Sequence, residues 1–326
     1  MEVHVQNRAG AAIAFVLAGV FAISINDMLI KQLSGGYPLH EIVFARALIG
    51  IIVGLALVQI EGGWRILKTR QAHWHVLRGL LVVIANMTFF LALAALPLAD
   101  ATALFFVAPL FITLLSIPIL GEKVGVMRLS AVAVGFVGVI IMQHPWADAQ
   151  ALQASRLVLL LPVVSALTYA LNQLMTRKLG VHSKASALSV YIQGVFLCVS
   201  LGFFLVAGDG SFVATDSTPS MVFLLRAWVW PAAGDAWIFL ALGCNAAVIG
   251  YCLSQAYRIA DAATVAPFEY IGLPLAVLWG LVIFGDLPVW EVWVGIGLIL
   301  GSGLFVFLRE RQKAKVAVKS PTGRRH

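Results

Sequence analysis

Long apolar runs separated by short polar connections extend over nearly the whole chain. A helix needs roughly 20 consecutive apolar residues to cross the hydrocarbon of a bilayer, and ten of the runs are about this long. The pattern therefore predicts an all-α polytopic membrane protein with ten transmembrane helices. The expected spans are residues 10–33, 42–60, 75–95, 99–119, 126–143, 156–179, 187–207, 236–257, 262–284 and 290–308.

Two of these spans, the fourth and the ninth, are interrupted by proline and resemble each other. The run from Ala99 contains Pro109, and the run from Ala260 contains Pro267 and Pro274. Both open with Ala-Asp and close with glycine followed by an acidic residue. Interrupted spans at matching places in two halves of a membrane protein are typical of a transporter's binding site. We therefore expect helix breaks at these three prolines, next to a substrate.

The first and sixth spans also share an order of polar residues. Aligning SINDMLIKQL with YALNQLMTRKL brings Asn26 onto Asn172 and Lys31 onto Arg177. The fourth and ninth spans lie farther apart in the sequence than the first and sixth do. A longer loop in the second half, about residues 208–235, accounts for the difference. These correspondences predict a duplicated five-helix unit. The expected domains are residues 10–143, residues 156–308 and a basic tail, residues 309–326.

Five helices are an odd number, so the second unit must enter the membrane inverted relative to the first. Positively charged loops stay in the cytoplasm, so each loop that is basic in one half should be poor in basic residues in the other. The loop charges follow this alternation, which predicts inverted repeats with both termini cytoplasmic. The basic loops carry Arg65, Lys68, Arg70, Lys123 and Arg128 in the first half and Lys178, Lys184 and Arg258 in the second.

Composition agrees with a membrane protein and excludes an ordinary soluble one. Hydrophobic residues make up 61% of the chain and charged residues 11%, against about 25% charged residues in soluble domains. The net charge is +7, but seven of the 22 basic residues lie in the last 18 positions, so we expect no nucleic-acid partner. The three cysteines lie in expected spans without zinc-ligand spacing, so we expect no metal and no cofactor.

Glu269 is the outstanding ionisable residue of the ninth span. It follows the cytoplasmic start of that span by about eight residues, roughly 12 Å at 1.5 Å per residue, close to the membrane midplane. Carboxylates at such a depth usually mark substrate or proton pathways. Glu269 and the neighbouring Tyr270 are therefore predicted to bind substrate or a coupling proton. The alternative is a neutral glutamic acid hydrogen-bonded to a neighbouring helix.

Asp27 and Arg46 are expected at similar depth on adjacent antiparallel helices, near their outer ends. Buried opposite charges are tolerated mainly when they are paired. One interpretation is a structural ion pair that also involves Lys31. The other is an outer gate, or an Arg46 guanidinium that binds a substrate carboxylate.

Further candidates come from amide side chains and from the repeat. The amides of Asn26, Asn86, Asn172, Gln173 and Asn245 either line the site or join helices to one another, and Tyr191 lies next to the second-half position that corresponds to Arg46. Glycines on the fifth and tenth spans indicate close helix packing and a candidate homodimer face. These glycines are Gly135, Gly138, Gly295, Gly297, Gly301 and Gly303.

Several segments resemble the EamA family of the drug/metabolite transporter superfamily, in the branch of bacterial S-adenosylmethionine uptake transporters and the related riboflavin and metallophore transporters. The segments are INDMLIK (25–31), HEIVFARALIG (40–50), HVLRGLL (75–81), ADATALFFVAPLF (99–111), LGEKVG (120–125) and DAATVAPFEY (261–270).

The resemblance implies ten helices in two inverted repeats, with helices one to four and six to nine around a central cavity. It also implies ATP-independent secondary transport of a small organic metabolite, such as an amino-acid-, nucleoside- or vitamin-like compound, across the bacterial inner membrane by alternating access. A channel, a membrane scaffold and, less favoured, an intramembrane enzyme are the alternatives. An enzyme is disfavoured because the sequence has no HExxH or GxSxG site.

Overall fold

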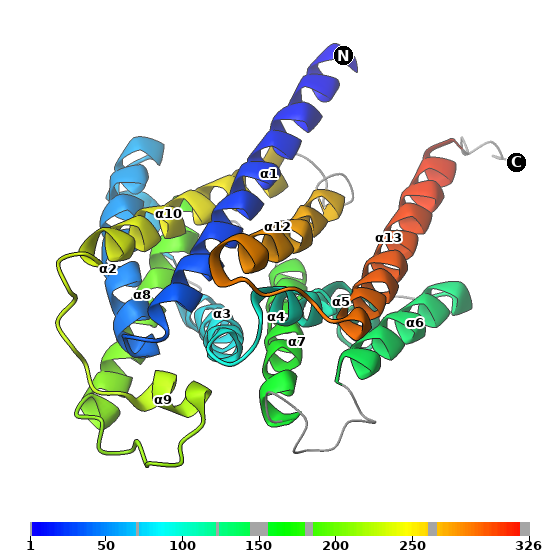
Figure 1. The fold of residues 1–326 in the computed structure, drawn as a ribbon. Coiled ribbons are helices and arrows are strands. Elements are labelled where there is room, and N and C mark those ends of the chain that lie inside the picture. The colour runs from blue at the N-terminus through cyan, green and yellow to red at the C-terminus, as the bar shows by residue number, and fades with distance from the viewer. Residues whose placement is uncertain are drawn as a thin grey trace, which may run out of the picture.

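The computed structural model describes residues 2–69, 72–121, 124–143, 156–179, 185–259 and 266–319. All regular elements in these ranges are helical, which confirms the predicted class (Figure 1). The elements are α1 (Glu2–Leu33), α2 (Leu39–Glu61), η1 (Trp64–Leu67), α3 (Ala72–Leu93), α4 (Leu98–Phe105), α5 (Ala108–Leu120), α6 (Val126–Met142), α7 (Arg156–Leu179), α8 (Ala185–Ala207), α9 (Pro219–Leu225), α10 (Ala236–Ile259), η2 (Ala266–Ile271), α12 (Gly272–Trp279), η3 (Gly280–Phe284) and α13 (Trp290–Lys319).

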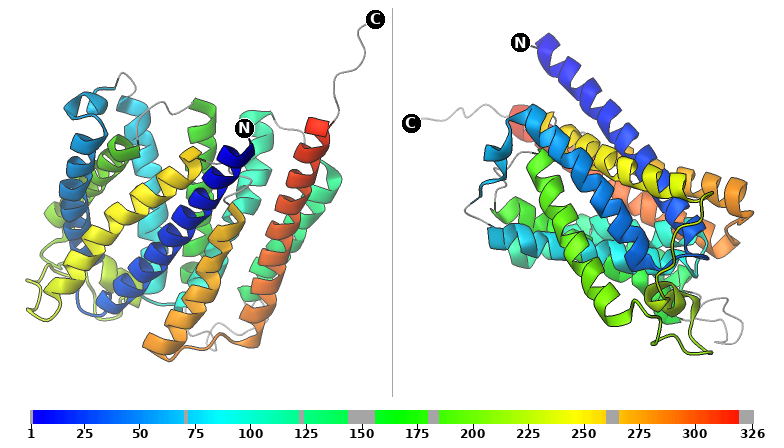
Figure 2. Two further views of the ribbon diagram at one scale, coloured as in Figure 1. Left: turned by 90° about the horizontal axis from the view of Figure 1, so that it is seen from above. Right: turned by 90° about the vertical axis from the view of Figure 1, so that its left-hand side faces the viewer.

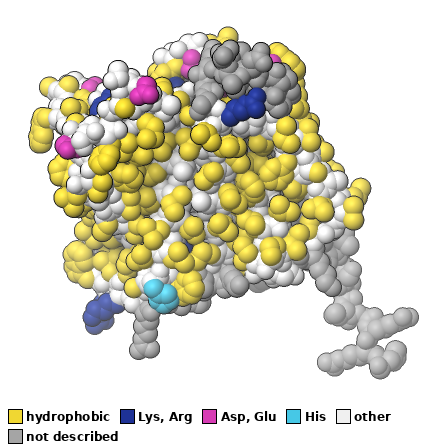
Figure 3. Space-filling model, turned by 90° about the horizontal axis from the view of Figure 1, so that it is seen from below, with side chains coloured by type: hydrophobic (Ala, Val, Ile, Leu, Met, Phe, Trp, Pro, Cys, Tyr) yellow, Lys and Arg dark blue, Asp and Glu magenta, His cyan; other side chains and the backbone are white. Residues whose placement is uncertain are grey.

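Within the described residues, seven helices are long and apolar enough to cross a membrane. Three further apolar helices are shorter and cover 129–142, 268–284 and 290–305. Figure 3 shows the corresponding surface, a broad hydrophobic belt with acidic side chains gathered at one edge of the face in view. A surface this apolar is stable only against lipid. The chain is a multi-pass integral membrane protein.

The long helices run side by side between two ends of a single bundle (Figure 2). The first residues of α1 and the last turns of α13 lie at the same end, which we call the terminal end. Four helix pairs dominate the packing: α1 against α10, α2 against α8, α3 against α7 and α6 against α13. The interrupted segments α4 and α12 contact each other between these pairs.

Both proline-containing segments are divided into shorter helical elements. In the first, α4 ends at Phe105 and α5 begins at Ala108, with Pro109 in its first turn, where a missing backbone N–H costs nothing. In the second, a 3₁₀ turn (η2) precedes α12 and a π-helical turn (η3) follows it. Both segments end at a left-handed glycine, Gly121 and Gly285, each with φ 71°.

The proline positions differ in their local setting. The backbone of Pro267 lies in η2, and its side chain falls outside the described part of the structure. Pro274 lies in the first turn of α12 and is exposed. The side chains of Arg70, Lys123, Arg128, Lys178, Lys184 and Arg258 and of residues 310–326 are likewise outside it.

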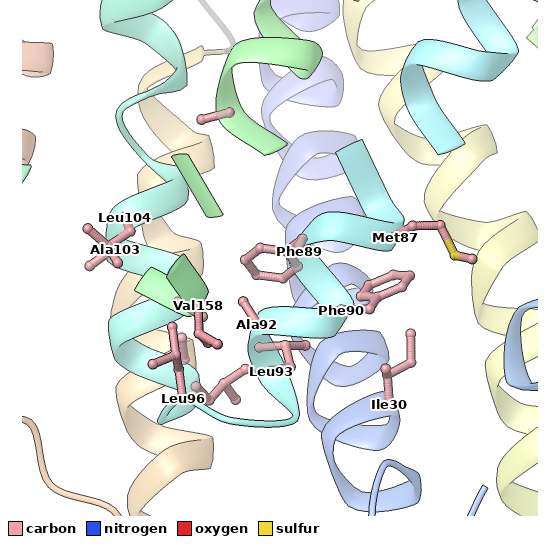
Figure 4. Close-up of a cluster of buried hydrophobic side chains, with 14 of the residues drawn as sticks. Ile30, Met87, Phe89, Phe90, Ala92, Leu93, Leu96, Ala103, Leu104 and Val158 are labelled. Carbon is pink, nitrogen blue, oxygen red and sulfur yellow. The ribbon is translucent and has the colours of Figure 1, made fainter. Parts of the chain in front are cut away.

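The bundle interior is formed mainly by α3 and the helices around it. Phe89, Phe90 and Leu93 of α3 meet Ile30 of α1 and Leu104 of α4 in one buried cluster (Figure 4). Lipid tails are as apolar as these side chains, so close packing rather than water exclusion holds such helices together. The interior therefore depends on side-chain fit.

The connection 208–235 covers the bundle end opposite the termini, which we call the loop end. The Tyr37 hydroxyl donates to Asp235 Oδ2 (2.7 Å) and accepts the Ala232 N–H (2.9 Å). The hydrogen bond to Asp235 raises the pKa of the Tyr37 hydroxyl. Arg226 donates to the Gly35 carbonyl (2.7 Å). These bonds fasten the connection to the segment between α1 and α2.

Candidate functional site

A cavity of about 420 Å³ lies among the helices. Its wall is contributed by α1, α2, α3, α4, α7, α8, α10, η2 and α12, and its volume is in the range of small-molecule sites. The polar lining residues are Ser24, Asn26, Asp27, Arg46, Arg78, Asn86, Thr102, Ser165, Tyr169, Ser189, Gln193 and Glu269. The lining phenylalanines are Phe89, Phe90, Phe105, Phe106 and Phe196.

The cavity extends from the middle of the bundle toward the terminal end. On α8, which starts at the terminal end, the lining residues lie in the first half, from Leu188 to Phe196. On α10, which runs back to that end, they lie in the second half, from Ala246 to Leu253. Toward the loop end the wall is completed by Arg46, near the start of α2, and by Leu98, the first residue of α4.

Asn26 links the two charged residues at the deep extremity of the cavity. Its Nδ2 donates to Asp27 Oδ1 (3.1 Å), and Arg46 Nη1 donates to Asn26 Oδ1 (3.3 Å). The Arg46 guanidinium also faces the rings of Phe90 (5.5 Å) and Phe196 (5.2 Å). Such cation–π contacts compensate in part for the loss of water around a buried cation. Asp27 and Arg46 also interact electrostatically, so the amide and the attraction of opposite charges act together.

Lys31 lies apart from this group. Its Nζ donates to the carbonyls of Leu93 (3.2 Å) and Leu96 (2.6 Å), at the C-terminal end of α3. A cation at this position also compensates the negative end of the helix dipole. Asp100 and Asp286 interact with it electrostatically. Lys31 therefore ties the loop end of the bundle together and is not shared with Asp27.

Glu269 reaches the cavity from η2, next to the interruption before α12. It interacts electrostatically with Tyr169 of α7 and with its neighbour Tyr270. The Tyr169 hydroxyl accepts a hydrogen bond from Gln173 Nε2 (2.7 Å). A carboxylate beside a phenol in a largely apolar wall is suited to hold a proton or a cationic group.

Three buried polar atoms of the cavity residues make no hydrogen bond within the described structure: Arg46 Nε, Arg78 Nε and Gln193 Oε1. They come from α2, α3 and α8. Buried polar atoms are almost always hydrogen-bonded, and an unpaired one costs about 1–3 kcal/mol. Two donors and one acceptor of cavity-lining residues therefore have no hydrogen bond within the described structure.

The structure brings five of the predicted site residues into the cavity wall, and the side chain of Pro267 lies outside the described residues. Those in the wall are Asp27, Arg46, Asn26, Asn86 and Glu269. Tyr270, Asn172, Gln173, Tyr191, Asn245, Pro109 and Pro274 are absent from the described wall.

The residues outside the wall have visible packing roles. The Asn245 amide donates to the Ala22 carbonyl (2.6 Å) and so joins α10 to α1. The Tyr191 hydroxyl donates to the Leu67 carbonyl, and its ring stacks on His75 with centroids 4.8 Å apart. The ring of Tyr270 packs against Gly303 of α13.

Sequence reasoning missed Arg78, Tyr169 and Ser165 as lining residues. Arg78 carries a signal in the sequence, since it is a basic residue inside the expected third span. Nothing in the sequence singled out Tyr169 or Ser165, because apolar segments conceal which face turns inward. Ser165 also donates to the Ala85 carbonyl (2.6 Å), so it contributes to helix contact as well.

A multi-pass helical protein with a polar and aromatic cavity between its helices has the construction of a small-molecule transporter. The profile of the "EamA-like transporter family" matches residues 10–143. The chain is 32% identical to a riboflavin transporter of Vibrio cholerae over 93% of this chain and 95% of that one. It belongs to the EamA-like transporter family and is a transporter rather than an enzyme.

Other relatives agree with this assignment. A riboflavin transporter of Rhizobium johnstonii is 32% identical over 81% of this chain and 76% of its own. An S-adenosylmethionine uptake transporter of Rickettsia prowazekii is 26% identical over 92% of this chain and 93% of its own. A crystal structure of a protein with 18% identity matches 95% of this chain and 99% of its own with a TM-score of 0.62, which supports the fold.

Proposed function

We propose that this protein is a secondary transporter that moves a small, flat, amphipathic metabolite across the bacterial inner membrane by alternating access. The observation that carries the proposal is a single aromatic-lined cavity whose wall also contains the charged residues Asp27, Arg46, Arg78 and Glu269. Riboflavin is the first candidate ligand, because the relatives at 32% identity bear that name. S-adenosylmethionine is the second.

The proposed architecture is ten transmembrane helices in two inverted five-helix repeats, residues 10–143 and 156–308. The helix contacts support it, because exchanging the two halves reproduces them. In this exchange α1 takes the place of α7, α2 that of α8 and α3 that of α10. The contact of α1 with α10 then corresponds to the contact of α7 with α3, and the contact of α2 with α10 corresponds to the contact of α8 with α3. The pairs α2–α8, α4–α12 and α6–α13 each correspond to themselves. The family profile, which ends at residue 143, agrees with the first repeat.

The proposed orientation has both termini and the tail 309–326 in the cytoplasm. The distribution of Lys and Arg between the loops supports it. The common position of the start of α1 and the end of α13 at one end of the bundle is also consistent with it (Figure 2). In this orientation the cavity faces the cytoplasm, and the connection 208–235 and Lys31 lie at the periplasmic side.

Transport would then proceed by rocking of the repeats around the cavity, as in other inverted-repeat transporters. The flat part of the ligand would pack among Phe89, Phe105 and Phe106, where aromatic rings favour offset or edge-to-face contact. Asn86, Asn26 and Asp27 would supply hydrogen bonds. Glu269 would carry a coupling proton between the two states. The remaining predicted residues, Tyr270, Asn172, Gln173, Tyr191 and Asn245, would support the wall from behind.

A homodimer through α6 and α13 is also proposed, in a form restricted by the packing. Gly138 and Gly295 face each other inside the chain, where a Cβ on Gly138 would lie 3.0 Å from the Gly295 carbonyl oxygen. Gly297 and Gly301 of α13 have nothing within 4 Å and are exposed. A dimer contact would therefore use the outer face of α13, and disulfide trapping of a Gly297→Cys variant in membranes tests it.

The test of transport is counterflow in proteoliposomes. Vesicles loaded with unlabelled riboflavin should accumulate labelled riboflavin from outside above the equilibrium level, because a carrier exchanges its ligand one molecule at a time. A channel would equilibrate the label without overshoot, and a scaffold would show no flux beyond protein-free vesicles. S-adenosylmethionine is tested in parallel. The proposal would be overturned if every metabolite of a nucleoside, vitamin and amino-acid panel either equilibrated without overshoot or showed no flux beyond protein-free vesicles.

A further inference from the structure

Arg78 stands out among the charged residues of the cavity. It lies on α3 seven residues into the helix, half-buried, and it lines the cavity. No hydrogen bond or ion pair connects it to another described residue, and its Nε is buried. Arg46, by comparison, is held by Asn26 and two phenylalanine rings. In the described cavity wall, the Arg78 guanidinium is thus the one guanidinium without a protein hydrogen-bond or ion-pair partner.

Burial makes this arrangement costly unless a ligand completes it. A guanidinium loses water when it enters a cavity wall and regains favourable interactions from an opposite charge. The titratable neighbour that interacts with Arg78 is His75, one turn earlier on α3, and this group is not acidic. The described part of the chain therefore places a cation in the cavity wall without an acidic partner beside it.

Its position along α3 separates it from the aromatic part of the cavity. Asn86 and Phe89 follow Arg78 by eight and eleven residues on the same helix, so they lie about 12 Å and 16 Å deeper at 1.5 Å per residue. Arg78 consequently stands near the terminal end, by which a ligand would enter or leave. The rings of Phe89, Phe105 and Phe106 lie toward the middle of the bundle.

We infer that the cavity selects a ligand with a flat apolar body and an acidic group, a carboxylate or a phosphate, and that Arg78 binds the acidic group. The inference rests on the proposed function and narrows its substrate class. The planar guanidinium offers parallel N–H donors that match the two oxygens of either group. Such charge-assisted bonds in a poorly solvated site distinguish an acidic ligand from its neutral analogue.

The experiment compares ligands that differ only in the acidic group. Isothermal titration calorimetry on the purified full chain would use two pairs, riboflavin with riboflavin 5′-phosphate and adenosine with adenosine 5′-monophosphate. We expect the phosphorylated member of at least one pair to bind about tenfold to a hundredfold more tightly. Arg78→Gln should reduce that affinity to about the level of the neutral member. Arg78→Lys, which keeps the charge but loses the fork, should give an intermediate value.

Arg65→Gln, an exposed arginine in η1 at the same end of the bundle, is the matched control and should preserve the preference. Thermal melting of each variant without ligand distinguishes loss of binding to the acidic group from loss of the fold. If Arg78→Gln does not fold, Arg78→Lys provides the second test of that binding. Equal affinities within both pairs, no binding by either phosphorylated ligand, or a preference that survives at Arg78→Gln and Arg78→Lys alike would overturn the inference. Failure of the proposed function would appear separately, as absence of counterflow.

Discussion

The ring of Phe106, at the end of α4, lies 5.4 Å from the ring of Tyr270, in η2. The two interrupted segments therefore touch at their points of interruption. A Cβ on Gly272, the first residue of α12, would also lie 3.4 Å from the Phe106 ring. Phe106 and Gly272 line the cavity, whereas Tyr270 points away from it toward α13. One junction thus connects the cavity wall to the peripheral helix pair α6–α13.

The first prediction concerns the far side of this junction. A methyl group at Gly303 would collide with the Tyr270 hydroxyl, so Gly303→Ala should reduce the free energy of unfolding by about 1–3 kcal/mol. Tyr270→Phe removes that hydroxyl and should restore part of the loss in the double variant. Thermal melting in detergent measures both effects. Gly297→Ala, with nothing within 4 Å, is the control, and equal melting temperatures of Gly303→Ala and Gly297→Ala would contradict the contact.

The second prediction concerns the amide between Asp27 and Arg46. Asn26→Ala removes both hydrogen bonds and leaves Asp27 Oδ1 and Arg46 Nη1 without these partners, which should cost about 1–3 kcal/mol of stability. Because Asn26 also lines the cavity, riboflavin affinity should fall as well. Asn245→Ala also removes an amide, a half-buried one that joins α10 to the Ala22 carbonyl, so it should lower stability and leave affinity unchanged. Parallel effects of both variants on affinity would argue against a ligand role for Asn26.

The helical class and the two interruptions could be predicted because they depend on local rules. Apolar runs of spanning length determine the class without reference to neighbours, and proline marks both interrupted segments, although Pro162 lies inside the continuous helix α7. The inward faces could not be predicted in the same way. Leu188, Ile192, Gln193 and Phe196 line the cavity, yet Tyr191 turns toward Leu67 because successive helical residues point about 100° apart. In a segment that is apolar all round, only tertiary packing decides which of these neighbours faces inward.

The third prediction concerns closure of the loop end. Lys31→Met would remove the hydrogen bonds to the carbonyls of Leu93, the last residue of α3, and of Leu96 in the turn that follows, together with the positive charge beside Asp100. The free energy of unfolding should fall by about 1–3 kcal/mol. Amide hydrogen exchange in residues 93–98 should become faster, because this end of the bundle would open more often. Lys68→Met, an exposed lysine at the opposite end, should change neither measurement, and unchanged exchange in Lys31→Met would remove Lys31 from the closure.

The last prediction concerns coupling at Glu269. If this carboxylate takes up and releases a proton during each cycle, glutamine fixes it in a form that resembles the protonated one. Glu269→Gln should then lose uptake driven by a pH gradient to a much greater extent than riboflavin exchange at equal pH, which needs no net proton movement. Proteoliposomes with and without an imposed gradient give both rates for the same preparation. Asp216→Asn changes an exposed carboxylate in the connection 208–235 and should leave the ratio of the two rates unaltered. A wild-type ratio in Glu269→Gln would show that the coupling group lies elsewhere, and the glutamate would then be assigned to ligand binding or to helix packing according to whether its substitution changes riboflavin affinity.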